Sequence, residues 1–443
     1  MKKTLLLSAI ACVAFASIKA QDIINLGVND DIKVTLAAYT GSNVVLVIPA
    51  GYTNPQSVPT ATVGTTTTYA WNNLDLSTLT NLTSNTKITI KGDGSNPAFT
   101  LKTLILPPAL SKIAFKNLTI TGATPFGNIP GNPIDPTLNY IINLGAAVPT
   151  AVDSIVFDNC NITSIRSLIR FQSATAVTAP TQKANNVIIN NCIVRNSADY
   201  GAIYNSTTGG FFGPIKVTKS TFYGFGATVF MLQKNSTSIN ISDCTFDNIV
   251  GASAKALVDC STLVIPVTIT NSILGKTQLA SGGLTIKTAG TLTITNCYYT
   301  TDWTAATSTA TAGITGAFTA YSGLSTDLFT TASASTIATA SAPYITTIGN
   351  YKIKDTGFAG ANSAGDPRWY LNAPSAVNQV LSDKGVAFNG TEILNPKGLS
   401  LEVYNILGRK VAGSLTAIPT ANFAKGVYIV RISGSNDSLK III

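Results

Sequence analysis

An eight-residue pattern of apolar and polar positions recurs along the chain. The first and third residues of each copy are apolar, which is typical of a strand with one buried face. The copies begin at Ile113, Ile155, Val187, Ile215, Ile239, Val267 and Leu292. They start roughly 24 to 42 residues apart, a spacing that predicts a repeat architecture.

The fifth position of every copy breaks the alternation. Polar residues stand where an apolar residue is due: Asn117, Asn159, Asn191, Lys219, Asp243, Asn271 and Asn296. Small or apolar residues follow one place later: Leu118, Cys160, Cys192, Ser220, Cys244, Ser272 and Cys297. This slip of one residue predicts a corner between two short strands. Asparagine suits such a corner because it tolerates left-handed backbone and can hydrogen-bond locally.

Stacking the copies would place the corner residues above one another. Each coil would then bury its inner face only against its neighbours, as in a parallel β-solenoid. A second strand signal between copies, for example in 167–172 and 201–206, gives each coil at least three strands. We therefore predict an all-β protein built on a parallel β-helix. An ordinary β-sandwich with Asn-rich turns is the alternative that the shared slip disfavours.

The two ends of the chain differ from the repeats. Residues 1–20 combine two lysines, an apolar run and small residues, which predicts a secretory signal peptide. The apolar run is too short to span a membrane, and a lipoprotein cleaved before Cys12 is the less favoured alternative. The last fifty residues alternate cleanly, as in Leu399–Leu407, and predict a small antiparallel β-sandwich.

These signals divide the chain into six parts. We expect a signal peptide over 1–20, an N-terminal cap and first coils over 21–86, the parallel β-helix over 87–300, a closing coil and loops over 301–373, a linker over 374–395 and a C-terminal domain over 396–443.

Charge and cysteine content restrict the class of partner. The formal charge of +9 falls to +6 when Lys2, Lys3 and Lys19 leave with the signal peptide (9 − 3), and the remaining basic residues are scattered. This predicts a mildly basic secreted surface and no nucleic-acid binding. Five cysteines remain after loss of Cys12, and stacked cysteines point the same way, which suits disulfides poorly. We expect buried thiols and no metal site, since the chain has no histidine and no CxxC pair.

The C-terminal segment resembles a known export signal. Val403–Val411, Lys425–Ile432 and Lys440–Ile443 resemble the sorting domain of the type IX secretion system of Bacteroidetes. The resemblance implies Sec export to the periplasm, then passage through the type IX machinery by way of residues 396–443. It implies a secreted protein or one on the outer-membrane surface. We predict no membrane span and a monomer.

The repeats resemble the pectin-lyase-like right-handed β-helix proteins, and among them an uncharacterised group from Bacteroidetes with DUF4957 and DUF5123 domains. The resemblance rests on Asn159-Cys160, Asn191-Cys192 and the closing Gly365–Trp369. It implies a right-handed parallel β-helix. Our leading hypothesis is that the protein binds an acidic polysaccharide such as pectin. A further hypothesis is cleavage by β-elimination, in which a lyase of this fold would hold calcium in clustered carboxylates. The chain has only 20 Asp and Glu, so the sequence leaves open whether it is an enzyme.

Catalytic candidates come from the second-strand column and from one rung beside it. Arg170 and Asp259 fall in that column together with Tyr204, which we assign to substrate binding, while Arg195 and Asp199 follow one rung. An arginine beside a carboxylate would bind an acidic sugar or serve as a base and its partner. A solvated surface pair is the alternative.

Two further binding candidates lie in the closing segment. Trp369 would stack on a sugar ring, and Arg368 would clamp a carboxylate. Alternatively, Trp369 packs on the last coil and Asp366 sets the turn before Pro367. The competing function is a non-catalytic surface adhesin or structural protein.

Overall fold

The structure, a computed structural model, describes residues 21–55, 73–122, 140–145, 148–171, 182–197, 200–205, 210–250, 255–278, 283–305, 308–332, 349–372, 385–388, 391–433 and 438–443. The chain forms two compact units, residues 1–369 and 370–443, and each is described by itself.

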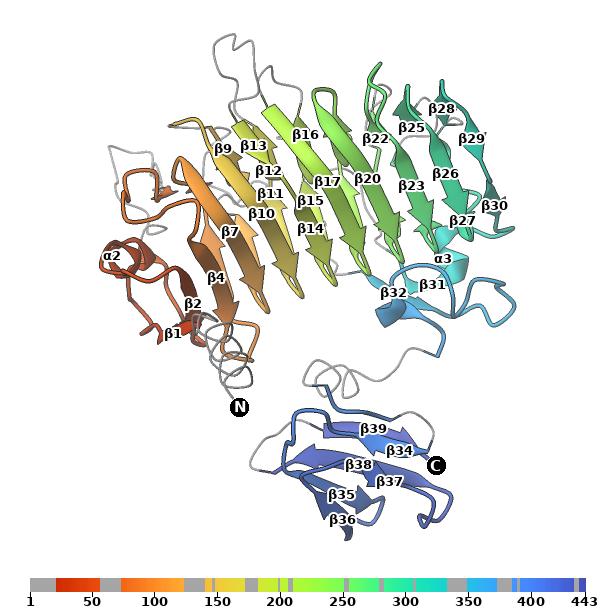
Figure 1. The fold of residues 1–443 in the computed structure, drawn as a ribbon. Helices are drawn as coiled ribbons and strands as arrows, with labels where there is room; N and C mark the ends of the chain where they lie inside the picture. The colour runs from red at the N-terminus through yellow and green to blue at the C-terminus, as the bar shows by residue number, and fades with distance from the viewer. Residues whose placement is uncertain are drawn as a thin grey trace, which may run out of the picture. The chain divides into compact units, whose positions relative to one another are not determined.

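Three parallel sheets make up the first unit (Figure 1). Sheet 1 contains β1 (Asp22–Asn25), β2 (Asn43–Ile48), β4 (Lys87–Gly92), β7 (Ala109–Lys116), β10 (Ala151–Asp158), β13 (Gln182–Ala184), β14 (Val187–Asn190), β17 (Gly210–Thr218), β20 (Ser236–Ser242), β23 (Val267–Thr270), β26 (Leu292–Thr295) and β29 (Ile314–Thr315). Sheet 2 contains β5 (Ala98–Leu101), β8 (Thr119–Gly122), β11 (Asn161–Ile165), β15 (Ile193–Ser197), β18 (Thr221–Phe225), β21 (Thr245–Asp247), β24 (Ile273–Leu274), β27 (Cys297–Tyr299) and β30 (Phe318–Ala320). Sheet 3 contains β3 (Leu74–Asp75), β6 (Leu104–Ile105), β9 (Tyr140–Leu144), β12 (Ser167–Phe171), β16 (Ile203–Asn205), β19 (Phe230–Leu232), β22 (Ala256–Asp259), β25 (Leu284–Thr288) and β28 (Thr309–Ala310).

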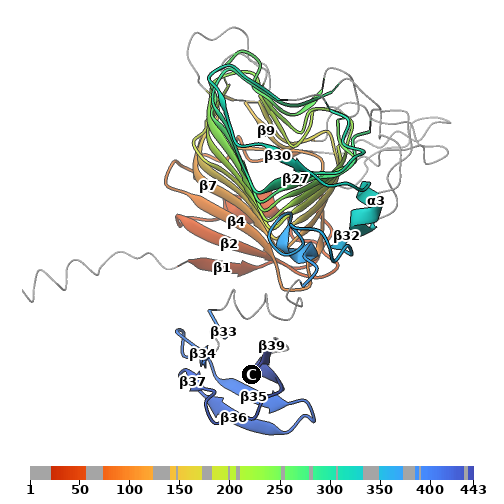
Figure 2. The ribbon, with the colours of Figure 1, turned by 90° about the vertical axis from the view of Figure 1, so that its right-hand side faces the viewer.

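From β4 to β28, each coil passes through all three sheets in turn, as β10, β11 and β12 do. Successive coils pair in register, so that Ile155 lies beside Val187 and Val187 beside Ile215. Figure 2 views the coils end on, with the three sheets around a common interior. The predicted parallel β-helix is therefore confirmed.

The seven predicted corners all adopt the left-handed backbone. The corner residues have φ between 47° and 55°, a region that is costly for most side chains and least so for Asn and Asp. Their amides form ladders along the stack: Asn191 Nδ2 donates to Asn159 Oδ1 at 3.0 Å, and Asn159 Nδ2 to Asn117 Oδ1 at 3.0 Å. Asn296, Asn271 and Asp243 form a second ladder with the same spacing. The corner is thus fixed by backbone conformation and by contact between coils.

The cysteine and serine column completes each corner. Each thiol or hydroxyl donates to the carbonyl oxygen two residues earlier, as Cys192 Sγ does to Asn190 at 3.2 Å and Ser220 Oγ to Thr218 at 2.7 Å. The column cysteines are free and buried, as predicted, and so is Cys260. Burial raises the pKa of Cys297 to about 11, so the thiol stays protonated at neutral pH.

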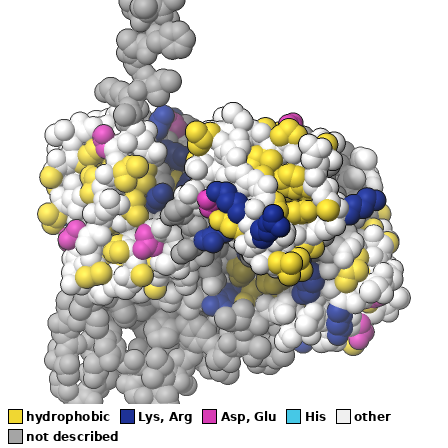
Figure 3. All heavy atoms as spheres, turned by 90° about the horizontal axis from the view of Figure 1, so that it is seen from below, with side chains coloured by type: hydrophobic (Ala, Val, Ile, Leu, Met, Phe, Trp, Pro, Cys, Tyr) yellow, Lys and Arg dark blue, Asp and Glu magenta, His cyan; other side chains and the backbone are white. Residues whose placement is uncertain are grey.

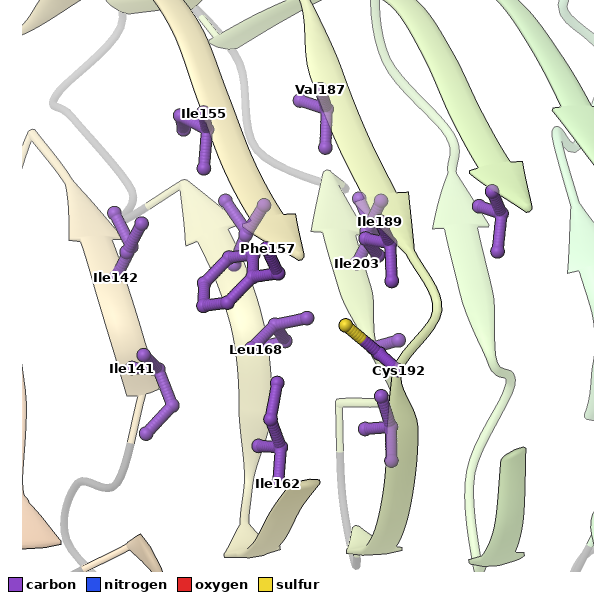
Figure 4. Packing of buried hydrophobic residues seen from close by; sticks show 14 of the residues in the cluster. Ile141, Ile142, Ile155, Phe157, Ile162, Leu168, Val187, Ile189, Cys192 and Ile203 are labelled. Atoms are coloured by element: carbon purple, nitrogen blue, oxygen red, sulfur yellow. The ribbon is translucent and has the colours of Figure 1, made fainter. Parts of the chain in front are cut away.

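The interior of the coils is filled by stacked apolar side chains. Figure 4 shows isoleucines from all three sheets around Phe157 and Cys192. Phe115 and Phe157 stack with ring centroids 5.0 Å apart, and Phe222 and Phe246 with centroids 5.3 Å apart. Because a coil buries its inner face only against its neighbours, these columns supply most of the apolar burial.

The two ends of the coil stack are built differently. At the N-terminal end, helix α2 (Ile32–Ala37) buries Ile32 and Leu36, and Asp31 caps it by accepting from Lys33 N at 2.7 Å. At the other end, β28, β29 and β30 add one coil beyond the last copy of the pattern. After it come α3 (Ser325–Leu328) and the antiparallel pair β31 (Phe329–Thr331) and β32 (Asn350–Ile353).

The second unit consists of two small antiparallel sheets. They contain β33 (Ala387–Phe388), β34 (Glu392–Leu394) and β37 (Ile418–Pro419), and β35 (Leu401–Asn405), β36 (Lys410–Ser414), β38 (Val427–Ile432) and β39 (Ser438–Ile442). Leu401, Val403 and Val430 lie in their shared core. This confirms the predicted antiparallel C-terminal domain, although β33 and β34 fall within the stretch that the sequence assigned to a linker.

Substitutions at Asn159 should separate the two roles of a corner residue. Both substitutions remove the ladder amide, but Asn159→Gly also removes the Cβ from a backbone at φ 52°, whereas Asn159→Ala keeps it there. We expect the alanine variant to lose about 1 kcal/mol more of its unfolding free energy than the glycine variant. Urea unfolding followed by circular dichroism measures this, with Asn240→Ala on an exposed strand position as the control. A glycine variant less stable than the alanine variant would contradict the role of the left-handed backbone.

Candidate functional site

The outer face of sheet 3 brings several of the predicted site residues into one column. Arg170 pairs in register with Tyr204, Tyr204 with Met231, and Met231 with Asp259. Lys287 follows on the next coil. The shared column expected for Arg170, Tyr204 and Asp259 is therefore present.

Two arginines and three tyrosines gather at one end of this column, and we call them the Arg–Tyr cluster: Tyr140, Arg166, Arg170, Tyr200 and Tyr204. The Arg170 guanidinium lies 3.8 Å from the centroid of the Tyr140 ring, and that of Arg166 lies 4.8 Å from the Tyr200 ring. Tyr200 and Tyr204 meet edge to face, with centroids 4.6 Å apart. A cation over an aromatic ring is attracted by the electrons of its face. The tyrosine rings therefore hold the two guanidinium groups in fixed positions.

The charge of Arg170 is not neutralised by any residue that the structure describes. Its Nε donates to the neutral amide of Asn143 at 3.1 Å, and its plane rests on Tyr140. Burial lowers the pKa of Arg170, yet a guanidinium stays protonated at neutral pH. Burial also raises the pKa of Tyr140 to about 12, so the ring beneath it stays neutral. The cluster therefore presents net positive charge on a half-buried aromatic platform.

Asp259 is too far from Arg170 to act as its partner. Three coils separate them, which is roughly 14 Å at the usual strand spacing. The Asp259 carboxylate is 7% exposed and accepts from Gln233 Nε2 and from Ser261 N, both at 2.7 Å. The Asp259 carboxylate therefore stabilises its own turn and the contact with the preceding coil, and it does not share a site with Arg170.

Arg195 lies on a different face from Arg170. It projects from β15 of sheet 2, where its Nη1 lies 3.5 Å from the hydroxyl of the buried Tyr223. Tyr351 packs against Tyr223, with ring centroids 5.3 Å apart, and covers this part of the sheet. Asp199 lies outside the described residues. The structure thus does not bring Arg195 and Arg170 to one site.

Residues 349–369 form a strap that covers the outer face of sheet 2. The strap contacts five successive coils through Arg368 and Asn191, Trp369 and Thr221, Asp366 and Thr245, Gly365 and Asn271, and Ser363 and Asn296. In addition, the Tyr351 hydroxyl donates to Asp247 Oδ2 at 3.1 Å. The strap runs back along the stack, so its end lies several coils before the last one.

The strap shows that one expectation for its residues was wrong and that another was right. Trp369 does not pack on the last coil: its Nε1 donates to Thr221 Oγ1 of β18 at 2.7 Å, and its ring meets Tyr351. Asp366 does set the turn, since its Oδ1 accepts from Arg368 N at 3.1 Å at the start of the short 3-10 helix η2 (Pro367–Trp369). Its Oδ2 lies 2.8 Å from Arg368 Nε.

Arg368 closes the first amide ladder. Its Nη2 donates to Asn191 Oδ1 at 2.9 Å and to the Lys219 carbonyl at 3.1 Å, where the ladder would otherwise end at a lysine. Next to it lies a pocket of about 210 Å³ at the corner between sheets 1 and 2, which we call the corner pocket. Its lining residues are Asn96, Leu118, Thr119, Asn159, Cys160, Asn161, Asn191, Ile193 and Arg368.

The outer face of sheet 1 changes in character along the stack. On sheet 1, the outward positions of the later coils include Thr268, Thr270, Thr293 and Thr295, whereas Lys87 and Lys112 stand side by side on the early ones. Figure 3 shows the molecule from below, where Lys and Arg side chains form several groups and Asp and Glu side chains are scattered. In the described part of the chain, no three His, Cys, Asp or Glu side chains are grouped so that they would hold a metal ion.

Sequence reasoning missed three members of the Arg–Tyr cluster. Arg166 and Arg170 are four residues apart, and Tyr200 and Tyr204 repeat that spacing one coil later. This repeated spacing is the signal by which Arg166 and Tyr200 could have been found. Tyr140 follows a long insertion, and its sequence position gives no comparable sign.

Comparison with known families identifies the second unit. Residues 386–443 match the family described as the secretion system C-terminal sorting domain. The match begins ten residues before the start expected at 396. The chain is therefore a secreted or cell-surface protein that carries a type IX sorting domain. No curated protein and no solved structure matches the chain. None of the described helices is both long and apolar enough to cross a membrane.

The buried carboxyl of Asp366 should make the stability of the coil stack depend on pH. Asp366 is 1% exposed, and burial raises its pKa from 3.8 to about 6 despite the nearby Arg368. The folded state thus binds this proton more tightly than the unfolded state does. This difference in proton binding stabilises the folded state by at most about 3 kcal/mol. The stabilisation is greatest below pH 3.8 and is lost as the pH rises to about 6.

Urea unfolding of the wild type and of Asp366→Asn at several pH values tests this. Asparagine mimics the protonated carboxyl and does not titrate. The variant should gain stability relative to the wild type between pH 4 and pH 7. A stability difference that stays constant over this range would contradict the assignment.

Proposed function

We propose that the coil stack is an extracellular glycan-binding module that holds an acidic polysaccharide on the outer face of sheet 3. The observation that carries the proposal is the Arg–Tyr cluster, in which Arg170 is fixed on Tyr140 without a carboxylate partner among the described residues. The sorting domain supports it, because a protein delivered outside the cell meets polysaccharides there.

The chemistry of the cluster suits a uronate unit. A guanidinium offers two parallel N–H donors that match a carboxylate. Tyrosine rings provide flat apolar surface for the C–H face of a sugar, with a hydroxyl at the edge. In the cluster both elements stand side by side, since Tyr204 is the in-register neighbour of Arg170. A chain of sugars would continue along the column towards Lys287.

The arrangement supports binding more than cleavage. β-Elimination needs a base near the proton that is removed and a cation near the carboxylate of the same sugar. The nearest carboxylate of the column, Asp259, is roughly 14 Å from Arg170 and accepts hydrogen bonds from Ser261 of its own turn and from Gln233 of the preceding coil. Cleavage with Arg170 or Arg195 as the base is therefore a hypothesis for experiment. Calcium would be a cofactor only if the protein is such a lyase.

A second candidate is a non-catalytic adhesin or structural surface protein. It is favoured by sheet 1, whose later coils present rows of threonine and asparagine such as Asn240, Thr268 and Thr293. Such a face has many hydrogen-bonding groups and little charge. It suits contact with a solid or neutral surface better than recognition of one acidic unit.

Binding to polygalacturonate tests the proposal. We expect the full chain to bind it in isothermal titration calorimetry, and Arg170→Ala to weaken binding at least about tenfold, because a charge-assisted bidentate contact is lost. Arg170→Lys should recover only part, since an ammonium is not planar. Lys216→Ala, on exposed sheet 1, is the matched control.

The same samples distinguish the alternatives. Ultraviolet absorbance of an unsaturated product, lost in Arg170→Ala or Arg195→Ala, would establish a lyase. Equal binding by the wild type and Arg170→Ala would contradict the site. Absence of binding to any acidic polymer would favour the adhesin.

A further inference from the structure

We infer that the corner pocket is a second carbohydrate site, which takes a single neutral sugar unit through its hydroxyl groups. The pocket lies on the corner between sheets 1 and 2, away from the outer face of sheet 3 that holds the Arg–Tyr cluster. The inference goes beyond the acidic-polymer site and does not depend on it.

The pocket is framed by parts of the chain that are far apart in sequence. Asn96 lies at one end and Arg368 of the strap at the other, while Asn161 and Ile193 come from adjacent strands of sheet 2. Asn96 has φ 51°, and its carbonyl accepts from Thr119 Oγ1 at 3.2 Å, which fixes the near wall. The walls are therefore held by the coil stack and the strap rather than by a free loop.

The pocket offers hydrogen-bond donors that the fold does not use. Arg368 donates from Nη2 to Asn191 and Lys219, while its Nε lies 2.8 Å from Asp366 Oδ2 in an ion pair without hydrogen-bond geometry. None of the described residues accepts a hydrogen bond from its Nη1. A guanidinium has five N–H donors, so an incoming acceptor would find donors already held in place.

The pocket also contains an acceptor that the fold does not use. Asn161 Oδ1 is buried and has no hydrogen-bond partner among the described residues. An unpartnered buried carbonyl costs free energy, about 1–3 kcal/mol in typical proteins, so natural folds seldom keep one without a reason. A hydroxyl group of a ligand would satisfy it.

Charge and size decide between ligand classes. Arg368 is paired with Asp366 at 2.8 Å, so the pocket carries no net charge from this pair and has no surplus attraction for a carboxylate. Donors and acceptors side by side match sugar hydroxyls, which both donate and accept. A volume of about 210 Å³ is below the range of sites for drug-sized ligands and suits one ring.

Saturation-transfer NMR with the full chain and a panel of neutral methyl glycosides tests this inference, with galacturonate as the charged comparison. We expect at least one neutral glycoside to give a signal that exceeds that of galacturonate. Asn161→Leu should abolish the signal while leaving the unfolding midpoint unchanged or higher, because it removes an unsatisfied buried oxygen. Loss of binding with retained stability is an outcome that a purely structural role of Asn161 does not produce.

A second variant acts by volume alone. Ile193→Trp fills the pocket from its neighbouring strand and should also abolish the signal. Asn240→Leu, an exposed site on sheet 1, is the control and should bind normally. Arg170→Ala should also bind normally, which separates this site from the Arg–Tyr cluster. No signal from any neutral glycoside, or signals unchanged in both pocket variants, would overturn the inference.

Discussion

The coil stack depends on one constraint, the left-handed corner that each coil makes between sheets 1 and 2. The corner reverses which side of the chain faces inward, so that the strand before it and the strand after it both bury their apolar residues. Asparagine meets two requirements at once, because it tolerates φ near 50° and its amide spans the distance to the next coil. Where Lys219 interrupts the column, the strap supplies Arg368 in place of the missing amide.

The strap changes the energetics of the stack. In a solenoid each coil contacts only its neighbours, so stability is a sum of local terms and the ends fray easily. The strap joins coils that do not touch one another, from Asn191 to Asn296, and therefore couples their unfolding. This coupling has a cost, since Asp366 must be buried with its charge. Its contacts with Arg368 and Thr221 only partly offset that burial.

The pattern of apolar and polar residues predicted the fold well, because every coil repeats the same strand, corner and strand. The phase slip at Asn159 and its counterparts indicated both the corner and its backbone conformation. The strap could not be predicted in this way. Tyr351 and Asp247 are hydrogen-bonded although they are 104 residues apart in the sequence, and Arg368 and Asn191 are 177 residues apart. No sequence periodicity connects the members of either pair. For the same reason the column of Arg170 and Tyr204 followed from spacing, whereas Tyr140 depended on where the chain returns after an insertion.

The distribution of covered and open faces limits where a ligand can bind. The strap lies on the outer face of sheet 2 over the coils of Asn191 to Asn296 and covers Arg195, whereas Arg170 lies on sheet 3, outside the contacts of the strap. On sheet 3, folding alone does not require a cation above Tyr140: an apolar side chain would cover the ring without burying part of a charge. Partial burial of the Arg170 charge thus costs free energy, and binding of an anionic ligand would offset that cost. The same reasoning applies to Asn161. Its Oδ1 has no hydrogen-bond partner among the described residues, and selection for stability alone would not keep such a group.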